Sequence, residues 1–170
     1  LFVGSEVHST GLDISTEGRD VSVISGDGAG ASCRKCIDCE EHVGILSSAL
    51  HSQGKYAEAL MVEAPASRSN PRITFQMMEE RRHFPKMDGR TVFKQALTRL
   101  PETTQRTLQQ ADLGIADIDL VIPHQANIRI NQSFQKALGI GDEKMFHNIQ
   151  RYGNTTAGSI PIALDEALEL

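Results

Sequence analysis

Two polar side chains in the C-terminal third have the types and surroundings needed to stabilise a negatively charged oxygen. His124 follows the apolar residues Leu120–Ile122, Asn154 follows the apolar positions within Met145–Ile149, and a helix-like segment comes after each. A residue just past a buried strand of an α/β sheet points into the crevice at the carboxyl edge, where ligands bind. A neutral imidazole and a carboxamide both donate hydrogen bonds. We therefore predict that the two side chains converge on one ligand oxygen.

The segments around this pair alternate between strand and helix patterns. Leu120–Pro123 and a segment around Phe146–Ile149 are predicted strands. Asn127–Leu138 is a predicted helix closed by Gly139, and Ser159–Leu170 is a second predicted helix. A strand–helix–strand–helix order favours a parallel α/β sheet.

The N-terminal part contains further predicted strands and a glycine-rich segment. Leu1–Val7, Val21–Ile24 and Gly44–Leu50 are the strand candidates. Gly26–Ala31 is expected to form a tight turn with close backbone contact, since glycine lacks a Cβ atom. The segment lacks the lysine and spacing of a phosphate-binding loop, so we interpret it as structural.

A long surface excursion and an amphipathic helix follow. Pro65–Pro85 is expected to run over the surface. From Gly89 onward, apolar residues recur at three- and four-residue spacing, which predicts a helix that Pro101 ends or kinks.

The composition places the chain among globular domains. It has 170 residues, 39% hydrophobic and 23% charged, with a net charge of −5. We expect neither a membrane span nor nucleic-acid binding, because no long apolar run and no basic cluster stands out. Both Leu1 and Leu170 fall inside predicted core elements, which suggests a piece of a larger protein. Unpaired cysteines and the lack of an export signal favour the cytoplasm.

Three cysteines form a C-x2-C-x2-C pattern that superficially suggests a zinc or iron–sulfur site. Cys33, Cys36 and Cys39 have no matching fourth cysteine, although His42 would supply a fourth ligand. We predict that the chain holds no metal and assign these cysteines no role.

Four motifs, taken in order, resemble one known family. GDGAGA (Gly26–Ala31), MDGRTVFKQAL (Met87–Leu97), PHQANIRI (Pro123–Ile130) and RYGNTTAGSIPIALDEAL (Arg151–Leu168) are similar to the C-terminal half of β-ketoacyl-acyl carrier protein synthase III, a decarboxylating condensing enzyme of the thiolase superfamily. The resemblance implies an α/β, thiolase-like fold. Residues 1–170 would form one half of a five-layer α-β-α-β-α homodimer subunit, incomplete at both ends.

The resemblance also implies a reaction in fatty acid biosynthesis. A cysteine thiolate accepts an acyl group from acyl-CoA, malonyl-acyl carrier protein loses CO2, and the resulting carbanion attacks the acyl-enzyme. His124 and Asn154 match the catalytic histidine and asparagine, which stabilise the enolate. The substrates are acyl-CoA and malonyl-acyl carrier protein, and no separate cofactor is expected.

Further positions match the family's substrate-binding residues. Asn127 matches a contact to the pantetheine arm, and Arg129 matches a basic position that docks acyl carrier protein. Gly89 and Phe93 match residues that line the pantetheine tunnel and acyl pocket. Simpler interpretations exist for Asn127, as a helix cap, and for Arg129, as a solvated charge.

Two departures limit what the 170 residues are expected to do. The family's nucleophilic cysteine belongs to the N-terminal half, and none of the three cysteines here takes its place. The family's final strands, whose glycine-rich segment lines the site, are absent as well. The chain alone is therefore expected to be inactive. The alternatives are a related condensing enzyme of the long-chain head-to-head, quinolone or polyketide type, or a non-catalytic partner half.

Overall fold

The structure, a computed structural model, describes residues 1–38 and 43–169. Its N-terminal sheet pairs β1 (Phe2–Glu6) with β2 (Gly28–Ser32) in antiparallel fashion. Between them lie a short 3-10 helix, η1 (His8–Thr10), and one helical turn, α1 (Arg19–Ser22). The strand predicted within Leu1–Val7 is therefore confirmed.

Two other predictions in this region are wrong. Val21–Ile24 is helix and turn rather than strand, because the amides of Val21 and Ser22 donate to the Gly18 carbonyl. Gly44–Leu50, which lies wholly within the described residues, forms no strand and is largely exposed. Apolar residues alone do not make a strand when no neighbouring strand pairs with them.

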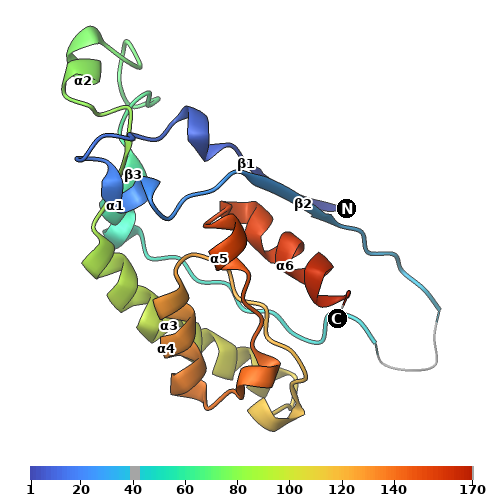
Figure 1. The fold of residues 1–170 in the computed structure, drawn as a ribbon. Helices are drawn as coiled ribbons and strands as arrows, with labels where there is room; N and C mark the ends of the chain where they lie inside the picture. The colour runs from blue at the N-terminus through green and yellow to red at the C-terminus, as the bar shows by residue number, and fades with distance from the viewer. Residues whose placement is uncertain (39–42, 170) are drawn as a thin grey trace.

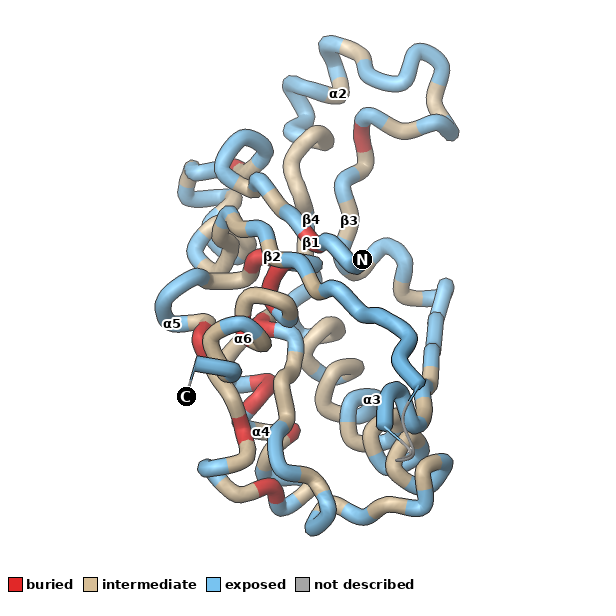
Figure 2. Tube along the Cα trace, turned by 90° about the vertical axis from the view of Figure 1, so that its right-hand side faces the viewer, coloured by how far each residue is buried: buried red, intermediate tan, exposed pale blue. Residues whose placement is uncertain are grey.

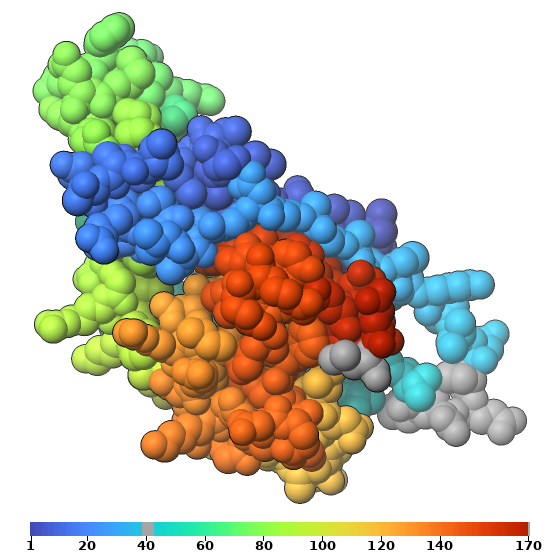
Figure 3. Space-filling view, in the orientation of Figure 1, coloured from blue at the N-terminus to red at the C-terminus, as the bar shows by residue number. Residues whose placement is uncertain are grey.

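A second antiparallel pair, β3 (Leu60–Val62) and β4 (Pro85–Met87), encloses the excursion predicted for Pro65–Pro85. The 3-10 segment η2 (Gly54–Ala59) precedes β3. The excursion carries α2 (Phe75–Glu79) and projects from one end of the molecule (Figures 1 and 3). It is a surface excursion, as predicted.

The longest helix, α3 (Gly89–Gln110), is capped by Asp88, whose carboxylate accepts a hydrogen bond from the Thr91 amide. It continues through Pro101, so the helix does not end at this residue, and the other predicted outcome, a kink at Pro101, stays a prediction. An internal proline weakens a helix, but packing on a neighbour offsets the loss. That neighbour is α4 (Ile128–Leu138), which lies beside α3 in Figure 1.

The ends of α4 are confirmed as predicted. The Asn127 side chain accepts a hydrogen bond from the Arg129 amide at 2.9 Å, which caps the first turn. Gly139 ends the helix with φ of 67°, a left-handed conformation that glycine adopts easily. The 3-10 turns η3 (Ile115–Asp117) and η4 (Asp142–Lys144) flank this unit.

The predicted parallel sheet is present only as two parallel bridges among the described residues, Val121 with Met145 and Ser25 with Asn154. Around the first bridge, the Val121 amide donates to the Lys144 carbonyl at 2.8 Å. The strand predicted at Phe146–Ile149 is wrong, because the chain turns into the helix α5 (Ile149–Tyr152).

The C-terminal helix α6 (Ser159–Ala167) follows the 3-10 turn η5 (Thr156–Gly158) and packs against β2. Close contacts of the N-terminal sheet with η5 and α6 account for two of its glycines. A Cβ at Gly30 would lie 2.9 Å from the Ile162 nitrogen, and one at Gly4 would clash with the Ala157 carbonyl oxygen. The expected close contact at Gly26–Ala31 is present, but most of that segment is strand rather than turn.

Buried residues gather around α4 and α6 (Figure 2). One cluster contains Phe134, Ile140 and Met145, with Val121 packed against it. This core holds the segment that leads into His124. Among the described residues, none of the helices combines the length and apolarity that crossing a membrane requires.

Candidate active site

His124 lies three residues after Val121, which forms the parallel bridge with Met145. It belongs to an irregular segment that leads to α4. Its Nδ1 atom lies 2.6 Å from the Ser159 hydroxyl oxygen. The side chain keeps an exposed face, while the protein around the ring lowers its pKa below the usual 6.5 by desolvating the charged form. The geometry favours a neutral imidazole held at Nδ1.

Asn154 is held by backbone contacts on one side and by its own side chain on the other. Its amide donates to the Ile24 carbonyl at 2.7 Å, and its carbonyl accepts from the Gly26 amide at 2.9 Å. Its Oδ1 atom accepts a hydrogen bond from the Thr156 amide at 2.8 Å. With Oδ1 engaged, the carboxamide nitrogen is the atom left to donate elsewhere.

A buried glutamine fixes the segment between these two residues. Gln125 is 1% exposed, and its Oε1 atom accepts hydrogen bonds from the amides of Asn148 and Ile149. Its Nε2 atom donates to the Pro123 carbonyl at 2.8 Å. Gln125 thus ties the segment of His124 to the start of α5, which leads directly into Asn154.

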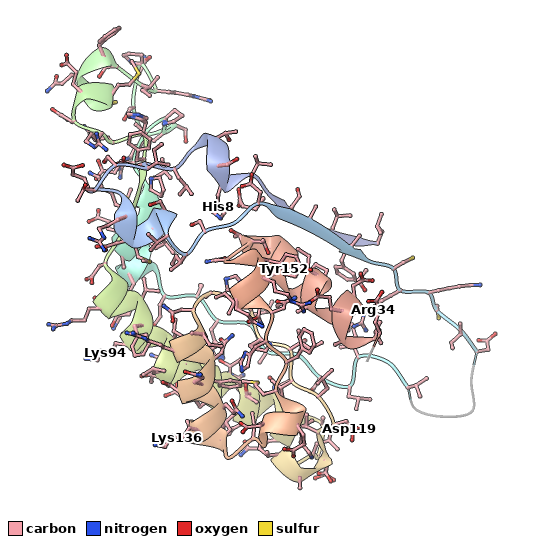
Figure 4. The ribbon with its side chains drawn as sticks, in the orientation of Figure 1. His8, Arg34, Lys94, Asp119, Lys136 and Tyr152 are labelled. Carbon is pink, nitrogen blue, oxygen red and sulfur yellow. The ribbon has the colours of Figure 1, made fainter. Side chains whose placement is uncertain are left out.

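A cavity of about 650 Å³ lies between α3 and α4. All four residues predicted to bind substrate line it: Gly89, Phe93, Asn127 and Arg129. The other lining residues were not predicted as site residues: Arg90, Lys94, Leu97 and Thr98. Figure 4 shows Lys94 on α3, beside α4. Apolar side chains and three cations share this groove, which suits a long, partly apolar ligand that ends in an anion.

The cysteines do not form a recognisable site. Cys33 and Cys36 are exposed, while Cys39 and His42 lie outside the described residues. Over residues 1–38 and 43–169, the His, Cys, Asp and Glu side chains form no group of three that would hold a metal ion. The absence of a metal site therefore stays a prediction.

Comparison with known proteins shows which family the chain resembles. Residues 108–170, which include His124 and Asn154, match the family described as 3-Oxoacyl-[acyl-carrier-protein (ACP)] synthase III C terminal. The chain is 44% identical over 170 residues to the β-ketoacyl-[acyl-carrier-protein] synthase III of Natranaerobius thermophilus, covering 99% of this chain and 50% of that protein. It is 41% identical over 167 residues to that of Clostridioides difficile, covering 98% and 49%.

Solved structures agree with the sequence comparison. The crystal structure of 3-oxoacyl-(acyl carrier protein) synthase III from Pseudomonas aeruginosa PAO1 matches with a TM-score of 0.82 at 33% identity, covering 98% of this chain and 48% of that one. The enzyme from Aquifex aeolicus VF5 matches with a TM-score of 0.77 at 34% identity, covering 98% and 47%.

The fold is therefore α/β and thiolase-like. Within that class, the chain is similar in sequence and in fold to the C-terminal half of β-ketoacyl-acyl carrier protein synthase III. It spans about half the length of the curated relatives it matches.

Several residues that the structure places at the site were not predicted from the sequence. Arg90 and Lys94 line the cavity, and a signal for them existed, because they lie one residue after Gly89 and Phe93. Ser159 and Thr156 contact the predicted pair through a hydroxyl and an amide. Nothing in their spacing marks them, since both contacts depend on how the chain folds back before α6.

Proposed function

We propose that the protein containing this chain is an acyltransferase that performs decarboxylative Claisen condensation in fatty acid biosynthesis. In the proposed reaction, His124 and Asn154 stabilise the enolate formed when a malonyl thioester loses CO2. The observation that supports this most directly is that the ring of His124 and the carboxamide of Asn154 each have one end fixed by the protein, at Ser159 and Thr156. Each side chain thereby keeps its opposite end for a ligand.

The chemistry follows from where negative charge develops. Loss of CO2 from the malonyl group leaves an electron pair that delocalises onto the thioester oxygen. Two fixed donors aimed at that oxygen stabilise it without reorganising, and each is worth roughly 2.7–4 kcal/mol of barrier. The carbanion then attacks the carbonyl carbon of an acyl-cysteine and displaces the thiolate. The family resemblance assigns that cysteine to the N-terminal half.

The cavity between α3 and α4 is the proposed binding site for the carrier arm. Phe93 and Leu97 offer apolar contact to the pantetheine chain, and Asn127 lies at the same groove. Arg90, Lys94 and Arg129 supply positive charge for a phosphate and for an acidic carrier protein. The chain as a whole has a net charge of −5, whereas the residues that line this groove include three cations and no acidic side chain.

The proposed partners are acyl-CoA and acyl carrier protein, and no separate cofactor is required. A homodimer working in the cytoplasm is part of the same proposal and rests on the family resemblance. A related condensing enzyme with another acyl specificity, and a non-catalytic partner half, remain the alternatives. The latter is disfavoured because a scaffold has no chemical need for the two fixed donors.

The test separates two half-reactions of the full-length protein. His124→Ala and Asn154→Ala should each slow CO2 release from a malonyl thioester by about 10²-fold or more. Transfer of a radiolabelled acyl group from acyl-CoA onto the enzyme should suffer less, because it depends on the cysteine thiolate. His51→Ala, which removes an exposed histidine, is the matched control and should change neither rate. Loss of acylation with CO2 release intact would overturn the assigned roles.

A further inference from the structure

Ser159 is the first residue of α6 and is only 2% exposed. Its hydroxyl oxygen lies 2.6 Å from Nδ1 of His124 and accepts a longer hydrogen bond, at 3.3 Å, from the backbone amide of Gln125. A residue 35 positions further along the chain thus contacts the ring atom of His124 that faces the protein.

The hydrogen-bond capacity of a serine hydroxyl decides where its proton goes. The group has one O–H donor and two lone pairs. The Gln125 amide uses one lone pair, and within the described residues the only acceptor bonded to the hydroxyl is Nδ1 of His124. If Nδ1 carried a proton, the buried O–H would lose that acceptor, and leaving a buried donor unsatisfied is unfavourable. The O–H therefore donates to Nδ1.

We infer that Ser159 is a positioning residue that holds His124 in the neutral tautomer protonated at Nε2. Nδ1 acts as the acceptor, so the remaining N–H points away from Ser159 and serves as the donor to the ligand oxygen. This inference rests on the proposed function for the use of that donor, but the tautomer itself is a property of the resting protein. Second partners of catalytic histidines commonly set the tautomer and ring orientation in this way.

Gln125 reinforces the arrangement. Its backbone amide holds the serine oxygen, while its buried side chain bonds to the backbone at Pro123 and Asn148. The residue next to His124 therefore fixes both the backbone that carries the imidazole and the hydroxyl that orients it.

The experiment measures the tautomer directly by ¹⁵N NMR of histidine-labelled full-length protein. The His124 signals are those missing from His124→Gln. In the unsubstituted protein we expect a protonated Nε2 and an unprotonated Nδ1; a protonated Nδ1 would overturn the inference. Because this measurement needs no Ser159 variant, it tests the inference even if such a variant does not fold.

The variants then separate positioning from general structure. Ser159→Ala should produce a mixture of tautomers and lower kcat for CO2 release by about tenfold to a hundredfold, with a smaller change in KM. Ser159→Thr, which keeps the hydroxyl, should restore the tautomer and most of kcat. Ser47→Ala is the matched control, since that hydroxyl donates to the Thr107 carbonyl, and it should change neither readout. A single Nε2-protonated tautomer with full kcat in Ser159→Ala would refute the role of Ser159. The expected tautomer combined with unimpaired CO2 release by His124→Ala would instead refute the proposed function alone.

Discussion

The backbone amide of Thr156 donates a hydrogen bond to Oδ1 of Asn154 at 2.8 Å. Thr156 adopts φ of 49°, a left-handed conformation that is uncommon for a threonine. Its hydroxyl lies 2.8 Å from Nε2 of His8, which helps to hold this conformation. The carboxamide of Asn154 is therefore oriented by a turn, and the orientation rather than the residue type alone makes its nitrogen the available donor.

This relationship predicts the effect of replacing Asn154 with aspartate. Asn154→Asp keeps an oxygen for the Thr156 amide but replaces the donor nitrogen with a second carboxylate oxygen. The rate of CO2 release should fall by about 10²-fold or more, while the unfolding temperature should stay close to that of the original protein. Steady-state decarboxylation and thermal denaturation measure both quantities. An Asp variant that decarboxylates normally would show that the nitrogen does not donate to the enolate.

The lowered pKa of His124 determines how CO2 release should depend on pH. Burial around the ring disfavours the charged form, so the imidazole should stay neutral as the pH falls through 6.5 and take up a proton only below it. CO2 release should stay constant through that region and then decline at lower pH. An NMR titration of the His124 ring gives the pKa directly, and a pKa above 6.5 would contradict the structure.

The same shift affects stability. The unfolded chain binds a proton to His124 at higher pH than the folded chain does, so the free energy of unfolding should decrease as the pH falls below about 6.5. His124→Gln should lessen this decrease, which denaturant unfolding at a series of pH values would detect. An unchanged pH dependence in that variant would mean that His124 is not the group responsible.

The cations of the cavity should act on binding rather than on chemistry. Arg90→Glu and Lys94→Glu place negative charge where the groove is positive, so the KM for malonyl-acyl carrier protein should rise. The kcat measured with a short malonyl thioester that lacks the carrier protein should change little. Lys136→Glu, on α4 but outside the residues that line the cavity, is the control for total charge. Equal effects of all three variants would remove the case for docking at this groove.

Gln125 should be among the most costly residues to truncate. Gln125→Ala leaves the amides of Asn148 and Ile149 and the carbonyl of Pro123 without their side-chain partner in the interior. A loss of about 2–4 kcal/mol in the free energy of unfolding is expected. Gln76→Ala, at an exposed glutamine bonded to Glu80, should stay within about 0.5 kcal/mol. Denaturant unfolding of both variants compares them, and similar losses would contradict the structural role of Gln125.

Glycines of the N-terminal sheet provide a test of the fold. A Cβ at Gly30 would lie 2.9 Å from the Ile162 nitrogen, so Gly30→Ala should push α6 from β2 and cost about 1–3 kcal/mol. At Gly54 nothing lies within 4 Å of such an atom, so Gly54→Ala should be tolerated. Thermal unfolding distinguishes them, and an equally stable Gly30→Ala would rule out the close packing of α6.

Local chemistry made some of these features predictable. Asn127 and Gly139 mark the two ends of α4, because a carboxamide caps the first turn of a helix and glycine accepts a positive φ after the last turn. The spacing around Phe93 likewise predicted α3. Elsewhere, side-chain contacts outweighed the local sequence pattern. The segment Phe146–Ile149 leads into a helix instead of forming a strand, because the Gln125 side chain accepts hydrogen bonds from the amides of Asn148 and Ile149.

The site was predictable in part for the same reason. His124 and Asn154 stand out because a polar residue follows an apolar run, and four motifs in order gave the family resemblance. The partners Ser159 and Thr156 depend on the path of the chain between α5 and α6, which no local pattern specifies. Their roles follow from hydrogen-bond capacity once the contacts are known.

A crystal structure of the full-length protein with a malonyl thioester analogue that cannot decarboxylate would show whether His124 and Asn154 donate to the same oxygen. The thioester oxygen of the analogue should lie about 3 Å from both Nε2 of His124 and the carboxamide nitrogen of Asn154. An ordered analogue whose thioester oxygen contacts neither atom, or a site in which the two side chains point in opposite directions, would contradict this prediction.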